Sequence, residues 1–150
     1  MSLDPTPGKQ ICVAIVDDET SVRVSLRRLC EALGLRATVY SSGQEFIESL
    51  DVGAPPPDCL LLDAHMPQMT GLEVQRHLVA CGARFPTVVY TADDAPEAQA
   101  RYMAAGVAEY LRKPVGGEEL LQVIERWVTA HRWSATDSTT NSNPTSSPTT

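Results

Sequence analysis

The chain has 150 residues, the usual length of one domain, and 43% of them are hydrophobic, which is enough for a sizeable core. It is acidic, with a formal net charge of −7, and it shows no basic stripe of the kind that binds nucleic acid. We expect no signal peptide, because the first residues lack a charged segment followed by an apolar core, and no apolar run comes near the ~20 residues that cross a membrane. We therefore expect a cytoplasmic protein without direct nucleic-acid or membrane contacts.

Composition divides the chain into three parts. Residues 1–9 are short and polar and are predicted to be a flexible N-terminus, whereas residues 10–133 carry the alternating apolar pattern of a folded domain. Residues 134–150 are almost all Ser, Thr, Asn and Pro, which bury too little apolar surface to offset the entropy of ordering. We predict a disordered tail there. The sequence leaves open whether the chain stands alone or is a fragment of a longer protein.

The four cysteines are widely spaced and form no C-x-x-C pair. They are Cys12, Cys30, Cys59 and Cys81, and each has apolar neighbours in the sequence. This pattern favours buried free thiols in a reducing compartment over a disulfide framework or a zinc site.

Between the two ends, apolar strands alternate with amphipathic helices. The predicted strands cover 11–16, 36–40, 58–62, 86–90 and 108–111. The predicted helices cover about 20–33, a segment that opens at a capping box at 42–45, a segment from the capping box at 70–73 towards 81, the segment from 96 to 106, and about 118–132. Strand–helix alternation is typical of a parallel sheet with helices on both faces, so we predict an α/β doubly wound fold.

Polar residues with a coherent chemistry follow the predicted strands. Asp17 and Asp18 end the first, Asp63 the third and Thr91 the fourth, while Lys113 follows the fifth. In open parallel sheets such residues meet at the carboxyl edge, where ligands bind. Packed carboxylates repel each other, and a hard divalent cation such as Mg²⁺ (or Mn²⁺) would relieve that repulsion. Asp63 could then attack phosphorus while the ammonium and the hydroxyl contact phosphoryl oxygens.

The chain resembles the receiver domain of bacterial two-component response regulators. The resemblance is carried by VDDE at 16–19, LDAHMPQMTG at 62–71, TA at 91–92 and YLRKP at 110–114, and it covers roughly residues 9–133. The run at 21–26 is similar to receivers that usually precede a helix-turn-helix domain, yet only the polar tail follows residue 133. The resemblance implies a flavodoxin-like sheet with strand order 2-1-3-4-5.

The resemblance also implies roles for individual residues. Asp63 would accept the phosphoryl group, and Asp18, Asp63 and the backbone carbonyl of His65 would ligate the metal, with Asp17 joining through water. The Lys113 side chain would pair with the phosphoryl group, and the peptide bond that follows it would be cis. Thr91 and Tyr110 would form the conformational switch. The partners would be a sensor histidine kinase or phosphotransfer protein and an unknown downstream protein, with a possible homodimer through the face of helix 4, strand 5 and helix 5.

Simpler interpretations exist for single residues. Asp17 and Asp18 could merely favour the start of a helix, and Asp63 could begin a turn. Thr91 is a common residue type at any strand end. Tyr110 could be a packing residue, and from the residues alone this interpretation is about as strong as a switch role. These interpretations weaken for the acids once the matching strand ends are considered together.

Three functions compete. The first is a phosphorylation-controlled signalling module that catalyses only its own phosphorylation and dephosphorylation, and is otherwise no enzyme. The second is a phosphorylation-independent interaction module with the same fold. The third is a hydrolase with an aspartyl nucleophile; it ranks low because such enzymes commonly carry a second acid two residues on, where this chain has His65.

Overall fold

A computed structural model describes residues 10–145 of the chain, with side chains from 10 to 132. It contains β1 (Cys12–Val16), α1 (Thr20–Ala32), β2 (Arg36–Tyr40), α2 (Gly43–Asp51), β3 (Cys59–Leu62), α3 (Gly71–Ala80), β4 (Thr87–Thr91), α4 (Pro96–Ala104), β5 (Glu109–Arg112) and α5 (Gly117–Thr145). The predictions for residues 1–9 and 146–150 lie outside the described residues. Each predicted strand and helix is present, with ends shifted by a few residues at most, except in α5.

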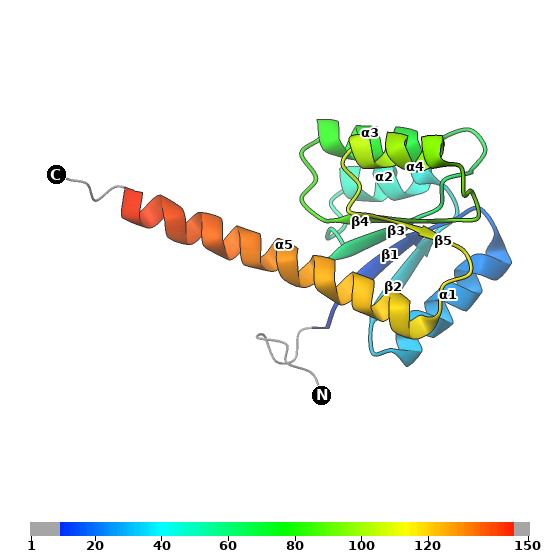
Figure 1. Cartoon of the computed structure of the whole chain (residues 1–150), viewed down its shortest axis with the longest axis horizontal. Coiled ribbons are helices and arrows are strands. Elements are labelled where there is room, and N and C mark those ends of the chain that lie inside the picture. Colours follow the sequence, from blue (N-terminus) through cyan, green and yellow to red (C-terminus); the bar gives the residue numbers. More distant parts are fainter. Residues whose placement is uncertain (1–9, 146–150) are drawn as a thin grey trace.

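The five strands form one parallel sheet in the order β2-β1-β3-β4-β5, which confirms the predicted fold class and strand order. Helices α2, α3 and α4 cover one face, and α1 and α5 cover the other (Figure 1). Successive residues of β1 and β3 therefore enter different cores. Val13 and Ile15 pack with residues of α1 and α5, while Ala14 and Val16 pack with residues of α2 and α3. Burial on both faces explains why the central strands are continuously apolar.

The strand register aligns the carboxyl ends of the sheet. Val16 at the end of β1 pairs with Leu62 at the end of β3, and Val89 of β4 pairs with that same Leu62. Strand β4 pairs with β5 along its other edge, where Thr91 lies opposite Arg112, the last residue of β5. The residues that follow these strands consequently emerge side by side, and this places the site described below.

Helix α3 begins with the predicted capping box. The Thr70 hydroxyl accepts a hydrogen bond from the Glu73 N–H (3.2 Å), and the Glu73 carboxylate accepts one from the Thr70 N–H (2.8 Å). At α2 only half of the predicted box forms. Ser42 accepts from the Glu45 N–H, but the Glu45 carboxylate accepts from Ser41 instead. Both caps satisfy N–H groups that a helix start leaves without partners.

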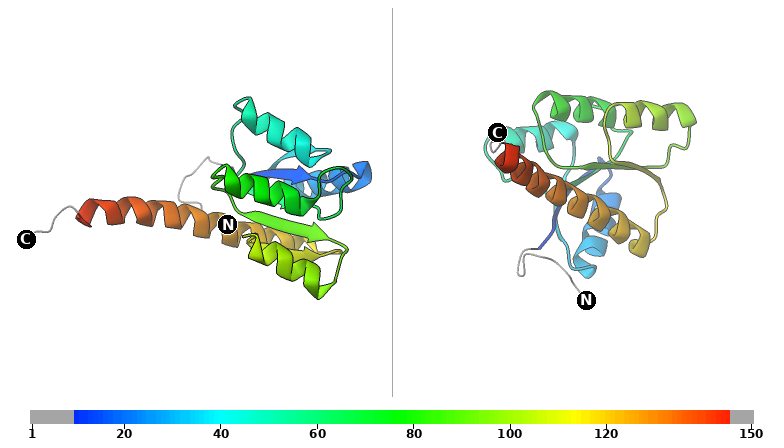
Figure 2. Two further views of the ribbon diagram at one scale, coloured as in Figure 1. Left: turned by 90° about the horizontal axis from the view of Figure 1, so that it is seen from above. Right: turned by 60° about the vertical axis from the view of Figure 1, so that its left-hand side comes forward.

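Helix α5 is longer than the sequence predicted. It runs from Gly117 to Thr145 and projects well beyond the sheet (Figures 1 and 2), whereas the sequence analysis ended this helix near 132. The disordered state of residues 134–150 stays a prediction. None of the helices in residues 10–145 is long and apolar enough to cross a membrane.

The cysteines fall into two groups. Cys30 and Cys59 are fully buried, and burial raises the pKa of the Cys30 thiol to about 11 and that of Cys59 still further. Cys12 is half-buried, and Cys81 is exposed, with its sulfur 3.4 Å from the His77 Nε2. The interpretation of four buried thiols is therefore right for two of them and wrong for Cys81, which follows the last turn of α3 at the surface.

This difference should be visible in thiol chemistry. We expect an aromatic disulfide reagent at pH 8 to modify Cys81 rapidly in the folded protein, and Cys30 and Cys59 only after unfolding, because only accessible thiolates react. Absorbance of the released thiolate measures both phases. Cys81→Ser should remove the fast phase and Cys12→Ser should leave it in place; a fast phase that survives Cys81→Ser would contradict the assignment.

Candidate functional site

Three carboxylates meet at the carboxyl edge of the sheet. Asp17 and Asp18 follow β1, Asp63 follows β3, and one oxygen from each lies within 4.8 Å of the others. The Asp63 N–H donates to the Val16 carbonyl (3.0 Å), which continues the β1–β3 pairing by one residue and holds the acids together. The predicted convergence of the strand-end acids is thus present.

Lys113 reaches the same cluster from the loop after β5. Its Nζ lies 3.3 Å from Asp17 Oδ2 and 3.7 Å from Asp63 Oδ1, and it lies 5.3 Å from the centre of the Tyr90 ring. The Lys113 N–H donates to the Thr91 carbonyl (2.7 Å), which anchors the loop to β4. The following bond to Pro114 is cis, as predicted. One ammonium therefore faces two buried carboxylates.

The acids are in different electrostatic environments. The pKa of Asp63 is raised from an ordinary value of 3.8 to about 6. Burial is the largest cause, the charges of Asp17 and Asp18 act in the same direction, and Lys113 opposes them. Asp17 is buried, with one carboxylate oxygen accepting from the Glu19 N–H (2.9 Å) and the other paired with Lys113. Asp18 is exposed. A single ammonium does not offset three carboxylates at this range, so an added cation would stabilise the cluster.

The donor set fits a hard divalent cation. All three side chains offer carboxylate oxygens, the ligands that Mg²⁺ and Mn²⁺ favour, and the described residues place no sulfur or imidazole among them. The exposure of Asp18 leaves room for the water molecules that Mg²⁺ usually keeps.

The two predicted switch residues lie beside the cluster without touching it. Thr91 is buried, and its hydroxyl accepts a hydrogen bond from the Asp93 N–H (3.2 Å). Tyr110 is turned inwards, and its hydroxyl donates to the Asp93 carbonyl (3.0 Å). Among residues 10–132 neither hydroxyl bonds to the carboxylates. Both instead fix the loop that leads from β4 into α4.

The His65 side chain pairs with Asp93, which lies outside the cluster of three carboxylates. It is 69% exposed, and its Nε2 lies 2.9 Å from Asp93 Oδ2. The pKa of Asp93 is lowered, chiefly by the hydrogen bond that its carboxylate accepts from the Ala95 N–H and secondly by His65. The imidazole thus joins the loop after β3 to the loop after β4, a contact that the sequence analysis did not predict.

Two further residues shape the site from α3 and α4. A Cβ added at Gly71 would lie 2.5 Å from the Asp63 carbonyl oxygen and 2.9 Å from the Tyr102 hydroxyl. The Tyr102 hydroxyl donates to the Ala64 carbonyl (3.2 Å), and burial raises its pKa to about 12, so it remains a donor at neutral pH. The sequence offered a weak signal for Tyr102, an aromatic residue with a polar tip on the inner face of a helix.

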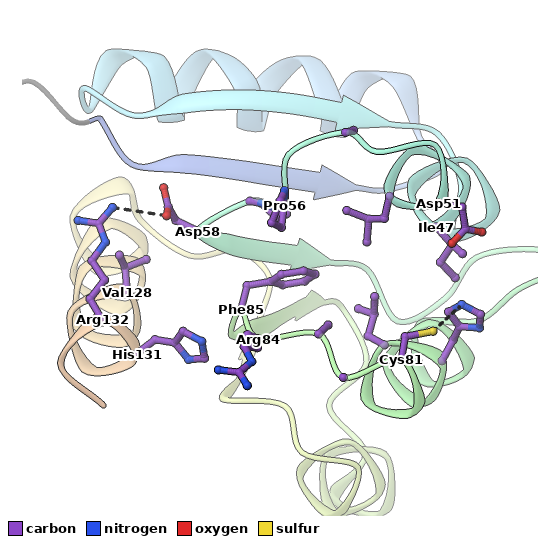
Figure 3. Close-up of a pocket in the computed structure, with 17 residues that line it drawn as sticks. Ile47, Asp51, Pro56, Asp58, Cys81, Arg84, Phe85, Val128, His131 and Arg132 are labelled. Carbon is purple, nitrogen blue, oxygen red and sulfur yellow. Dashed lines mark hydrogen bonds and ion pairs between the residues drawn. The ribbon is translucent and has the colours of Figure 1, made fainter. Parts of the chain in front are cut away.

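A large cavity lies elsewhere. It has a volume of about 1160 Å³ and is lined by residues of α2, α3 and α5 and by the loops that precede β3 and β4, among them Phe85, Arg84 and His131 (Figure 3). None of the predicted site residues lines it. The loops that precede strands lie at the amino edge of the sheet, so the cavity is at the edge opposite to the acids.

Comparisons with known proteins identify the family of the chain. A family model described as a response regulator receiver domain matches residues 13–125. The response regulator protein TmoT of Ectopseudomonas mendocina is 35% identical over 112 residues, which are 75% of this chain and 50% of TmoT. The response regulator MprA of Mycobacterium ulcerans is 38% identical over 109 residues, 73% of this chain and 46% of MprA. The chain therefore spans about half the length of these curated relatives.

Solved structures share the fold. A receiver domain protein from Methanospirillum hungatei JF-1 aligns with a TM-score of 0.77 at 21% identity, covering 84% of this chain and 99% of that one. The chemotaxis protein CheY4 of Vibrio cholerae aligns with a TM-score of 0.71 at 25% identity, covering 79% and 99%. Because the receiver model matches well over half of the sequence, and the acids lie together as the motifs predicted, the chain belongs to the response regulator receiver family.

Proposed function

We propose that Asp63 accepts a phosphoryl group from a phosphohistidine on a sensor kinase or phosphotransfer protein, and that this modification controls binding to a downstream protein. One observation carries the proposal. The Asp63 carboxylate shares a 4.8 Å cluster with two other acids and lies 3.7 Å from the Lys113 ammonium. This is the charge arrangement that an incoming phosphoryl group and its counter-ion need.

The transfer uses groups that the chain itself supplies. An Asp63 carboxylate oxygen attacks phosphorus, a new O–P bond forms, and the P–N bond to the donor imidazole breaks, leaving a neutral imidazole whose other nitrogen carried the proton. The Lys113 ammonium pairs with a phosphoryl oxygen and gives up part of its present contact with the Asp63 carboxylate. In a separate second step water attacks phosphorus, the O–P bond to Asp63 breaks, and inorganic phosphate leaves while the carboxylate is restored. The chain thus acts only on itself.

The metal is proposed to be Mg²⁺ or Mn²⁺. Asp18, Asp63 and the His65 backbone carbonyl are the proposed ligands, with Asp17 acting through water because both of its oxygens already have protein partners. Bound there, the ion would supply positive charge opposite the transferred oxygens.

The switch is proposed to run through Thr91 and Tyr110. Both contact the backbone of Asp93, so a movement of the Thr91 hydroxyl towards a phosphoryl group would release the Asp93 N–H. That release shifts an equilibrium between two positions of the loop before α4. The proposed output surface is the face of α4, β5 and α5, for a partner protein or a second copy, in a cytoplasmic setting.

The other two functions find less support. Hydrolases with an aspartyl nucleophile commonly carry a second acid two residues after it, whereas here that residue is His65, whose imidazole pairs with Asp93 at 2.9 Å. A phosphorylation-independent module would not need the intact acidic cluster. Partner binding that is unchanged by both Asp63→Asn and a beryllofluoride mimic would favour that module.

Intact-mass measurement after treatment with acetyl phosphate and Mg²⁺ tests the proposal. We expect the wild-type chain to gain the mass of one phosphoryl group, stable in acid and labile in base. Asp63→Asn should gain none, because an amide is not a nucleophile here, whereas Asp51→Asn, an exposed acid at the end of α2, should behave as wild type. A wild-type chain that stays unmodified, or a phosphorylated Asp63→Asn, would refute the assignment.

A further inference from the structure

Helix α4 is tied to the loop after Asp63 by one buried side chain, Tyr102. Its hydroxyl donates to the Ala64 carbonyl at 3.2 Å, and the residue is 5% exposed. Ala64 directly follows the proposed phosphoryl acceptor. A buried hydrogen bond of this kind resists stretching, because breaking it would strand two polar groups away from water.

The same carbonyl has a second donor. The Gly71 N–H, at the start of α3, donates to the Ala64 oxygen at 3.1 Å. The absence of a side chain at Gly71 lets the Tyr102 hydroxyl and the Asp63–Ala64 backbone pack directly against the first turn of α3. One backbone oxygen therefore joins the acceptor loop to both α3 and α4.

The Tyr102 ring continues the connection towards β5. It packs against the Tyr110 ring with centroids 5.7 Å apart and planes tilted by 49°, and Val89 and Val107 belong to the same small core. Tyr110 in turn donates to the Asp93 carbonyl, in the loop that leads into α4. The two tyrosines thus form a continuous path, Ala64 carbonyl to Tyr102 to Tyr110 to the Asp93 carbonyl.

We infer that Tyr102 is a positioning residue that couples phosphoryl occupancy of Asp63 to the position of α4. This inference rests on the proposed function and adds a second link beside the Thr91–Tyr110 pair. A phosphoryl group brings about two negative charges and three acceptor oxygens to Asp63. Any displacement of the neighbouring Ala64 carbonyl acts on the last turn of α4 through the Tyr102 hydrogen bond, without passing through Thr91.

The test removes only the hydroxyl. Tyr102→Phe keeps the ring in the core, and Tyr40→Phe is the matched control because no hydrogen bond of the Tyr40 hydroxyl is found among residues 10–132 and its ring packs against Phe46, remote from α4. Hydrogen exchange of a peptide covering 96–104 is measured with and without beryllofluoride and Mg²⁺, a stable mimic of the phosphorylated state. Intact-mass phosphorylation by acetyl phosphate is measured in parallel.

We expect beryllofluoride to change the exchange rate of 96–104 in the wild type and in Tyr40→Phe. In Tyr102→Phe the ratio of the two rates should shrink by about five- to tenfold, the size of a typical coupling between sites, while Asp63 is still phosphorylated. A merely structural role would raise exchange equally in both states and leave the ratio unchanged. An unchanged ratio in a phosphorylated Tyr102→Phe would overturn the inference and leave the proposed function standing. A wild-type chain that is never phosphorylated would overturn both.

Discussion

Asp63→Asn is expected to stabilise the metal-free protein at pH 7 by about 2–3 kcal/mol while it abolishes phosphorylation. Burial and the charges of Asp17 and Asp18 raise the pKa of Asp63 from 3.8 to about 6, so the folded protein holds an ionised carboxylate at a cost. A pKa difference of this size is worth about 3 kcal/mol. The neutral amide has nearly the same shape and does not bear this cost.

The pH dependence follows from the direction of the shift. Because the folded pKa lies above the unfolded one, the wild type is most stable relative to the variant below pH 4, where Asp63 is protonated in both states. That stability is lost as the pH rises through about 6. Urea unfolding in the presence of a chelator should therefore show the gain from Asp63→Asn at pH 7 and none near pH 4.

Two comparisons make the result specific. Asp51→Asn, which removes an exposed charge on α2, should change the free energy of unfolding by less than about 0.5 kcal/mol. Mg²⁺ at a hundred times its dissociation constant should stabilise the wild type by about 2.7 kcal/mol and Asp63→Asn by much less, if Asp63 is a ligand. A gain that persists at pH 4, or equal stabilisation of both proteins by Mg²⁺, would contradict the role of the buried charge.

The sequence predicted the acid cluster because strand ends obey a simple geometric rule. Parallel strands that pair in register end at one edge, so the residues after β1 and β3 had to meet once the strand order was known. Strand order itself came from the motif resemblance, since periodicity shows only that strands alternate with helices. Asp17, Asp18, Asp63 and Lys113 were placed together correctly for this reason.

Contacts between side chains of different loops could not be predicted in the same way. The pairing of His65 with Asp93 and the bond from Tyr102 to the Ala64 carbonyl join residues 28 and 38 positions apart. Neither contact produces a periodic pattern in the sequence, because each depends on side-chain rotamers and on the distance between the two segments in the folded chain. The length of α5 was missed for another reason, since burial alone does not decide where a helix stops.

Gly71→Ala is expected to have a large effect on both stability and phosphorylation. Its Cβ would lie 2.5 Å from the Asp63 carbonyl oxygen, 2.9 Å from the Tyr102 hydroxyl and 3.1 Å from the Ala64 Cα. Two of these neighbours are backbone atoms, so the clash cannot be relieved by turning a flexible side chain. Overpacking of this kind costs about 1–3 kcal/mol, although alanine is otherwise favoured over glycine in a helix.

Phosphorylation should suffer more than stability, because the backbone that must yield belongs to the acceptor itself. A displacement of about 1 Å at a reacting group costs up to about a hundredfold in rate, so we expect a loss of this order with acetyl phosphate as donor. Gly116→Ala is the matched control. No atom lies within 4 Å of a Cβ added there, so it should cost less than about 1 kcal/mol and leave the phosphorylation rate unchanged.

The double variant Gly71→Ala with Tyr102→Phe separates the two parts of the clash. Removing the Tyr102 hydroxyl relieves the 2.9 Å contact but leaves the 2.5 Å contact with the Asp63 carbonyl oxygen. Stability should therefore recover only in part, and the phosphorylation rate should stay low. Full recovery of the rate would mean that the lack of a side chain at Gly71 matters only because it makes room for the Tyr102 hydroxyl, and not for the Asp63 carbonyl oxygen. A Gly71→Ala protein as active as wild type would show that the first turn of α3 can move without disturbing Asp63.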